Sequence, residues 1–195
     1  MKPLAIFTAL YLLYGSFVFL GNGNVEFIIY VGVIIAIFAG TLAFHKIVKF
    51  PVWMLWMLSV WGLMHVLGGA VAIGDHVLFA HQIYPFLDLG DEFYILKYDQ
   101  VVHGYLYGLV AVMSYYAVKQ SFSIISGSLM LATVAVLVSV GISGLNEIME
   151  FLISLFMVNG VGGYNNTMLD MCFNLTGAIA AIILYTKLKK DNTQD

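Results

Sequence analysis

The sequence predicts an all-α, polytopic transmembrane helix bundle with six spans. Of the 195 residues, 62% are hydrophobic and only 10% are charged, and the mean hydropathy is +0.95. A soluble domain usually carries about 25% charged residues, so much of this chain's surface must face lipid. The long apolar runs approach the roughly 20 residues that cross the hydrocarbon core of a bilayer. Short polar segments separate these runs, which predicts one transmembrane domain over residues 1–195.

The apolar runs follow one another with recognisable breaks. The first run resembles a signal peptide, but it lacks a clear small-residue cleavage site, and we interpret it as a retained span. Gly21-Asn22-Gly23-Asn24 is typical of a tight turn. A short basic loop precedes Pro51, and a longer acidic stretch precedes the fourth run. The predicted spans cover residues 4–20, 25–44, 52–73, 98–118, 124–158 and 168–188.

The fifth run is too long for a simple crossing. At 1.5 Å per residue, residues 124–158 would form a helix of about 52 Å. The run is therefore either one long or kinked crossing, a span plus an interfacial segment, or two spans broken near Gly141–Gly144. Cytoplasmic loops carry an excess of lysine and arginine. Six spans place seven of the eight lysines on one side, so we predict six spans with both termini in the cytoplasm: Lys2, Lys46, Lys49, Lys119, Lys187, Lys189 and Lys190.

Composition also excludes several classes of function. The chain contains no arginine and no clustered basic patch, which argues against a nucleic-acid partner. Cys172 is the only cysteine, so neither an intrachain disulfide nor a thiolate metal cluster is expected. The expected partners are membrane lipids, and the sequence does not give the oligomeric state.

Ionisable residues inside spans cost about 2.5–3.5 kcal/mol at mid-span and usually mark function. His65 lies in the third run, and Gly68-Gly69 after it would allow close helix approach. Asp99 and His103 open the fourth run with i,i+4 spacing, which puts them on one helix face, and Tyr107 continues that face.

The last two runs carry similar stripes. Glu147 and Glu150 share one face of the fifth run, with Asn146 beside them. Asn166, Asp170 and Asn174 open the sixth run at four-residue spacing. The six-span topology places all of these residues, together with those of the third and fourth runs, in the outer half of the bundle.

Four carboxylates at one depth of the bundle, beside two histidines, need their negative charge neutralised, because like charges repel in a low-dielectric environment. Protons, protonated histidines or metal ions would neutralise it. Carboxylates and imidazoles from bundle helices are the ligands of dinuclear carboxylate sites, and they also suit a hydrolytic zinc site. The predicted ligands of a divalent metal (zinc, or iron or manganese) are His65, Asp99, His103, Glu147, Glu150 and Asp170, with Asn146, Asn174 and Tyr107 as supporting polar residues.

Three interpretations stay open. The first is a membrane-embedded metal-dependent hydrolase or oxidoreductase acting on a lipid-like substrate, with Glu147 or Glu150 as the general base. Its metal would be held by His65, His103 and either Asp99 or Asp170. The second is a proton- or ion-coupled transporter, since Asp, Glu and His chains line transport paths. The third is a non-catalytic membrane helper protein.

The chain resembles the YjdF-like integral membrane proteins between about Met64 and Ala181. The similar pieces occur in a fixed order: His65-Val66-Leu67-Gly68-Gly69, Lys97-Tyr98-Asp99-Gln100-Val101-Val102-His103, Asn146-Glu147-Ile148-Met149-Glu150-Phe151 and Leu169-Asp170-Met171. A fainter similarity to VanZ-like proteins rests on two patterns that open helices: Asp99 with His103, and Asp170 with Asn174 and Gly177.

Two departures stand out: the YjdF-like pattern usually has Arg at the position of Gln100 and further acids within residues 164–167. The resemblance implies a six-span protein of the plasma membrane of a bacterium or archaeon, and it supplies no reaction.

Overall fold

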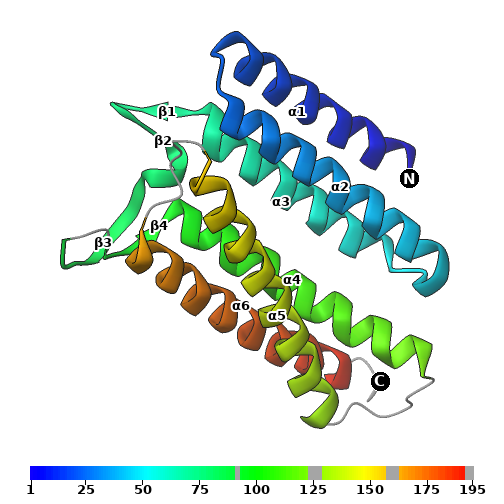
Figure 1. Cartoon of the computed structure of the whole chain (residues 1–195). Helices are drawn as coiled ribbons and strands as arrows, with labels where there is room; N and C mark the ends of the chain where they lie inside the picture. The colour runs from blue at the N-terminus through cyan, green and yellow to red at the C-terminus, as the bar shows by residue number, and fades with distance from the viewer. Residues whose placement is uncertain (91–92, 123–128, 157–162, 192–195) are drawn as a thin grey trace. The chain divides into compact units, whose positions relative to one another are not determined.

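The structure, a computed structural model, describes residues 1–90, 93–122, 129–156 and 163–191. In this part of the chain, six helices are long and apolar enough to cross a membrane, which confirms the predicted all-α polytopic class. They are α1 (Lys2–Gly21), α2 (Val25–Val48), α3 (Val52–Ala70), α4 (Tyr98–Ser121), α5 (Leu129–Ser154) and α6 (Tyr164–Asp191) (Figure 1).

The chain divides into two compact units, Met1–His81 and Gln82–Asp195. That they form one transmembrane domain stays a prediction.

The first unit contains α1, α2 and α3, and α1 packs against both of the other helices. Asn24 caps α2, because its side-chain oxygen accepts a hydrogen bond from the Phe27 N–H at 3.2 Å. The helix α3 ends at Ala70, three residues before the end predicted from hydropathy. Residues 72–73 are extended instead, since β1 (Ala72–Ile73) pairs with β2 (His76–Val77) around Gly74, whose φ is +60°. The short helix η1 (Leu78–Ala80) follows.

The glycine pair at the end of α3 makes room for aromatic rings. A Cβ on Gly68 would lie 2.6 Å from the ring of Phe79, and a Cβ on Gly69 would overlap the ring of Phe27. Gly69 therefore admits a ring from α2, and Gly68 admits one from η1. They hold η1 and the start of α2 against α3.

The second unit contains a β-hairpin and α4, α5 and α6, which contact one another pairwise. The hairpin joins β3 (Gln82–Asp88) to β4 (Tyr94–Lys97), and β4 leads directly into α4 (Figure 1). Tyr84 and Phe86 on β3 are exposed, which is typical of aromatic residues at a membrane–water interface.

Close contact between α4 and α6 depends on three glycines. A Cβ on Gly177 would collide with the backbone carbonyl of Gly104, and a Cβ on Gly108 would lie 3.0 Å from the Gly177 carbonyl oxygen. Gly104 and Gly108 are four residues apart and share a helix face, as in the small-residue contacts of membrane helices. This contact was not predicted from the sequence.

The predicted fifth span of residues 124–158 is longer than the helix that the structure describes. The helix α5 covers Leu129–Ser154, a length of about 39 Å, and it runs through Gly141 and Gly144 without a break. A two-span arrangement broken at these glycines is therefore wrong. Residues 124–128 and 157–158 of the predicted run lie outside the described residues.

We expect Gly177→Ala to destabilise the protein by about 1–3 kcal/mol, because the new methyl group forces the α4 and α6 backbones apart. Gly141→Ala is the matched control, since no atom lies within 4 Å of a Cβ at that position. Thermal unfolding in detergent micelles measures both variants. Equal midpoints for the two alanine variants would contradict the proposed tight contact.

Candidate metal centre

The junction between β4 and α4 positions the first residues of the site. Leu96 has a φ of +76°, which is unusual for a branched residue. The buried side chain of Gln100 stabilises this conformation, because its Oε1 accepts hydrogen bonds from the Leu96 and Lys97 N–H groups at 2.8 and 3.0 Å. Its Nε2 donates to the Tyr94 carbonyl at 2.7 Å. Gln100 thus fixes the point from which Lys97 and Asp99 project.

Asp99 and His103 lie one helical turn apart at the start of α4. The His103 Nε2 and Asp99 Oδ1 atoms are 3.7 Å apart, and the side chains are 12% and 21% exposed. This separation exceeds the 2.7–3.2 Å of a hydrogen bond. Asp99 is the more exposed of the two side chains, and it lies on the accessible side of the pair.

The helix α5 brings Glu147 to the opposite side of the His103 ring. The Glu147 Oε1 atom lies 3.6 Å from His103 Nδ1, and its side chain is 7% exposed. The neighbouring Glu150 accepts a hydrogen bond from Asn146 Nδ2 at 2.7 Å. About two turns before Glu147 on α5, the buried Ser139 hydroxyl donates to the backbone carbonyl of Tyr107 at 2.6 Å and so joins α5 to α4.

The helix α6 supplies a buried acid and its partners. Asp170 is 1% exposed, and its Oδ2 accepts a hydrogen bond from Asn166 Nδ2 at 2.7 Å. The Lys97 ammonium donates in turn to Asn166 Oδ1. A chain of contacts therefore runs from Lys97 through Asn166 to Asp170, and it ties the junction before α4 to the start of α6. Asn174 is fully buried one turn beyond Asp170.

Three potential ligands converge in this unit. Asp99, His103 and Asp170 each offer one ligand atom, and these atoms lie within 4.8 Å of one another. Glu147 Oε1, Asp170 Oδ1 and His103 Nδ1 are buried and have no hydrogen-bond partner among the residues that the structure describes. Buried polar atoms are normally paired, and each unpaired one costs about 1–3 kcal/mol. A bound cation would satisfy the carboxylate oxygens.

Four of the predicted site residues lie close together in the second unit: Asp99, His103, Glu147 and Asp170. Glu150 and Asn146 lie on the same helix as Glu147. His65 belongs to the other compact unit, where the rings of Tyr30, Trp61 and Phe79 lie 5.0–5.6 Å from its own. A role for His65 as a ligand stays a prediction.

One member of the site, Lys97, was not predicted from the sequence. It stands outside the four-residue stripes, yet it is buried and donates a hydrogen bond to Asn166. Asn166 itself continues the stripe of Asp170 and Asn174 at four-residue spacing. A lysine is therefore linked to the buried carboxylate of Asp170 through Asn166.

Comparison with known protein families gives one match. The family described as "Predicted membrane protein (DUF2238)" matches residues 3–191. The chain belongs to this family. Neither the comparison with curated proteins nor the comparison with solved structures gave a match. Membership of this family agrees with the six membrane helices, and the family description names no reaction.

We expect Lys97→Met to weaken the binding of a divalent metal by about 10- to 100-fold, because Asn166 then loses the cation that orients it toward Asp170. Lys97→Arg keeps the cation and should restore much of the affinity. Lys119→Met, near the other end of α4, is the control. Calorimetric titration of the chelator-treated protein with Zn²⁺ measures all of these variants. Unchanged affinity in Lys97→Met would contradict the role of this contact chain.

Proposed function

We propose that the chain is a membrane-embedded, divalent-metal-dependent enzyme whose metal is held by Asp99, His103 and Asp170. The observation that carries the proposal is the convergence of three ligand atoms within 4.8 Å, beside buried carboxylate oxygens that have no hydrogen-bond partner in the described part of the chain. Two ligands bound to one zinc ion at about 2.0–2.2 Å stand roughly 3–4 Å apart. Adjustments of about 1 Å or less would therefore bring these atoms to bonding distance.

The donor set favours particular metals. One imidazole and two carboxylates suit zinc, iron or manganese, and no thiolate is part of the group. Three protein ligands leave a position for water or substrate, which is the arrangement of catalytic rather than structural zinc sites. Asp99, the more accessible ligand, marks the side from which a substrate would approach.

The positions of the two glutamates favour different roles. Metal-bound histidines usually donate their second ring N–H to a carboxylate. Glu147 faces the Nδ1 side of His103, while the Nε2 side faces Asp99. We therefore assign Glu147 to orienting His103. Glu150, held by Asn146, is then the carboxylate available as general base for a metal-activated water.

A transport function receives less support from α4. Its first turns carry Asp99 and His103, whereas the buried side chains beyond Tyr107 are Leu109, Ala111, Val112, Tyr115 and Ala117, of which Tyr115 alone is polar. A proton or ion path along this helix would need polar groups there. The polar site is thus confined to one end of the helix, which favours chemistry at a membrane interface.

The substrate class follows from the position of the site. Lysine placement predicts that the start of α4 lies in the outer half of the membrane, so we infer that the substrate is a lipid, a lipid-linked intermediate or a quinone that enters laterally. We also infer the plasma membrane of a bacterium or archaeon as the location, from the resemblance to YjdF-like proteins.

We expect protein purified without chelators to contain about one divalent metal per chain, by elemental analysis. His103→Ala and Asp170→Asn should lose it, because each removes one of three ligands. His76→Ala is the control, since His76 stacks on His81 in the other compact unit. Chelation should lower the thermal midpoint of the wild type and not that of His103→Ala. Absence of metal in the wild type, or full occupancy in His103→Ala, would remove the proposal.

A further inference from the structure

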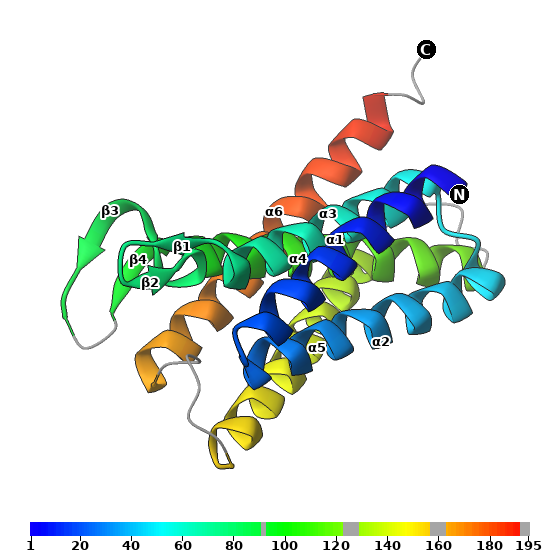
Figure 2. The same cartoon turned by 90° about the horizontal axis from the view of Figure 1, so that it is seen from above.

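The three-helix unit Met1–His81 contains an apolar groove that the proposed enzyme site does not use. Phe19 and Phe27 stack at 5.1 Å next to the turn that joins α1 to α2. From this turn the two helices diverge, as Figure 2 shows. A cavity of about 490 Å³ lies between them, with residues of α3 among its lining. This volume is within the roughly 300–1,000 Å³ of small-molecule sites.

The lining of the groove is suited to hydrocarbon. Ala5 and Ala9 lie one turn apart on α1, so their small side chains share a face and leave the groove wide. Leu55 and Leu58 of α3 contribute apolar side chains. Thr8 also lines the groove, but its hydroxyl is hydrogen-bonded to Ser59 Oγ at 2.6 Å. Water gains nothing in such a cavity, because a buried water needs two to four polar partners.

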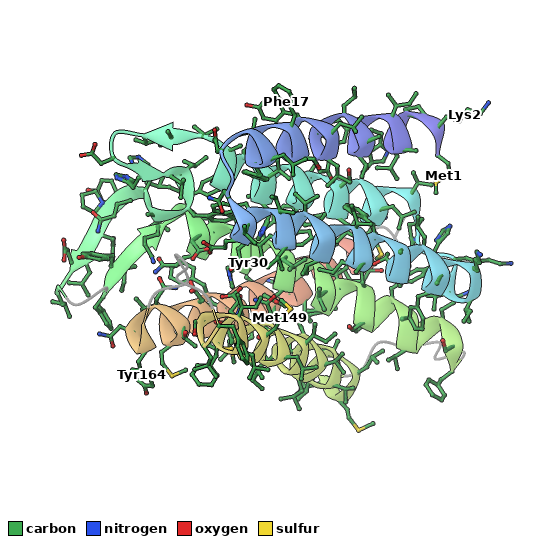
Figure 3. The ribbon with its side chains drawn as sticks, turned by 45° about the horizontal axis from the view of Figure 1, so that its top comes forward. Met1, Lys2, Phe17, Tyr30, Met149 and Tyr164 are labelled. Atoms are coloured by element: carbon green, nitrogen blue, oxygen red, sulfur yellow. The ribbon has the colours of Figure 1, made fainter. Side chains whose placement is uncertain are left out.

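The end of the groove away from the turn is positively charged. Lys2 lines the groove at the start of α1, and its side chain extends beyond the helix end (Figure 3). Lys46 follows the lining residue Leu42 by four residues and so shares its face of α2. The acids of this unit are Glu26, next to the α1–α2 turn, and Asp75, in the turn between β1 and β2. No acid is therefore close in sequence to the lysine-bearing helix ends.

We propose that this groove binds one acyl chain of an anionic phospholipid, with the headgroup phosphate against Lys2 and Lys46. The apolar lining selects hydrocarbon, and the two lysines select a negative headgroup in the adjacent leaflet. The attraction between the phosphate and the two lysines distinguishes this site from a lipid-facing surface, which any lipid can cover. The lipid would fill the space between α1 and α2 and join them where they diverge.

The test is native mass spectrometry of the full chain, delipidated in detergent and titrated with phosphatidylglycerol or phosphatidylethanolamine. We expect one phosphatidylglycerol per chain to be retained in preference to phosphatidylethanolamine. Ala9→Trp fills the groove and should abolish this retention. Leu10→Trp, on the exposed side of α1, is the matched control and should retain the lipid.

A second set of variants tests the headgroup contact without changing the packing of the groove. Lys2→Gln combined with Lys46→Gln should weaken phosphatidylglycerol binding by about thirtyfold and leave phosphatidylethanolamine unchanged. Lys119→Gln combined with Lys187→Gln is the charge-matched control in the other unit. Equal retention of both lipids by the wild type, or unchanged binding in Ala9→Trp, would overturn the proposal. A dimer that the wild type forms and Ala9→Trp loses, with lipid binding unchanged, would also overturn it, because a second copy of the chain would then occupy the groove.

Discussion

Gly104, Gly108 and Gly177 let the backbones of α4 and α6 touch, and the candidate metal centre depends on this contact. His103 directly precedes Gly104 on α4 and Asp99 lies one turn earlier, and Asp170 and Asn174 lie within two turns before Gly177 on α6. A side chain larger than hydrogen at Gly177 would separate the helices, and with them the carboxylates of Asp99 and Asp170. Ser139 joins α5 to the same pair through the Tyr107 carbonyl. The packing of α4 against α5 and α6 therefore determines the distances between Asp99, His103 and Asp170.

Burial of charge in an apolar surrounding is the second constraint. Asn166, which accepts a hydrogen bond from Lys97, donates one to Asp170 Oδ2, while Asp170 Oδ1 has no hydrogen-bond partner within the described ranges. Glu147 faces His103 at 3.6 Å, too far for a hydrogen bond. Unpaired buried charges are strongly unfavourable unless a proton or cation compensates them. A metal bound by Asp99, His103 and Asp170 would resolve this imbalance, and it would give His103 the orientation in which Glu147 can accept its second ring proton.

Much of this arrangement was predictable from the sequence, because helix geometry is regular. Hydropathy gave the six helices, and four-residue spacing gave the shared faces of Asp99 with His103 and of Asp170 with Asn174. Other features depend on tertiary contacts that spacing does not encode. The positive φ of Leu96 makes Gln100 a junction residue, and a long side chain carries Lys97 to Asn166. The helix α3 ends earlier than predicted because β1 pairs with β2, and Gly68 and Gly69 face the rings of Phe79 and Phe27.

The central claim is that one divalent metal joins α4 to α6. Anomalous diffraction from crystals of the chelator-free protein, recorded at the absorption edges of zinc, manganese and iron, tests it most directly. One peak about 2.0–2.2 Å from an oxygen of Asp99, an oxygen of Asp170 and a nitrogen of His103 is the predicted result. A peak only at His76 and His81, or metal in solution analysis with no peak between α4 and α6, would contradict it.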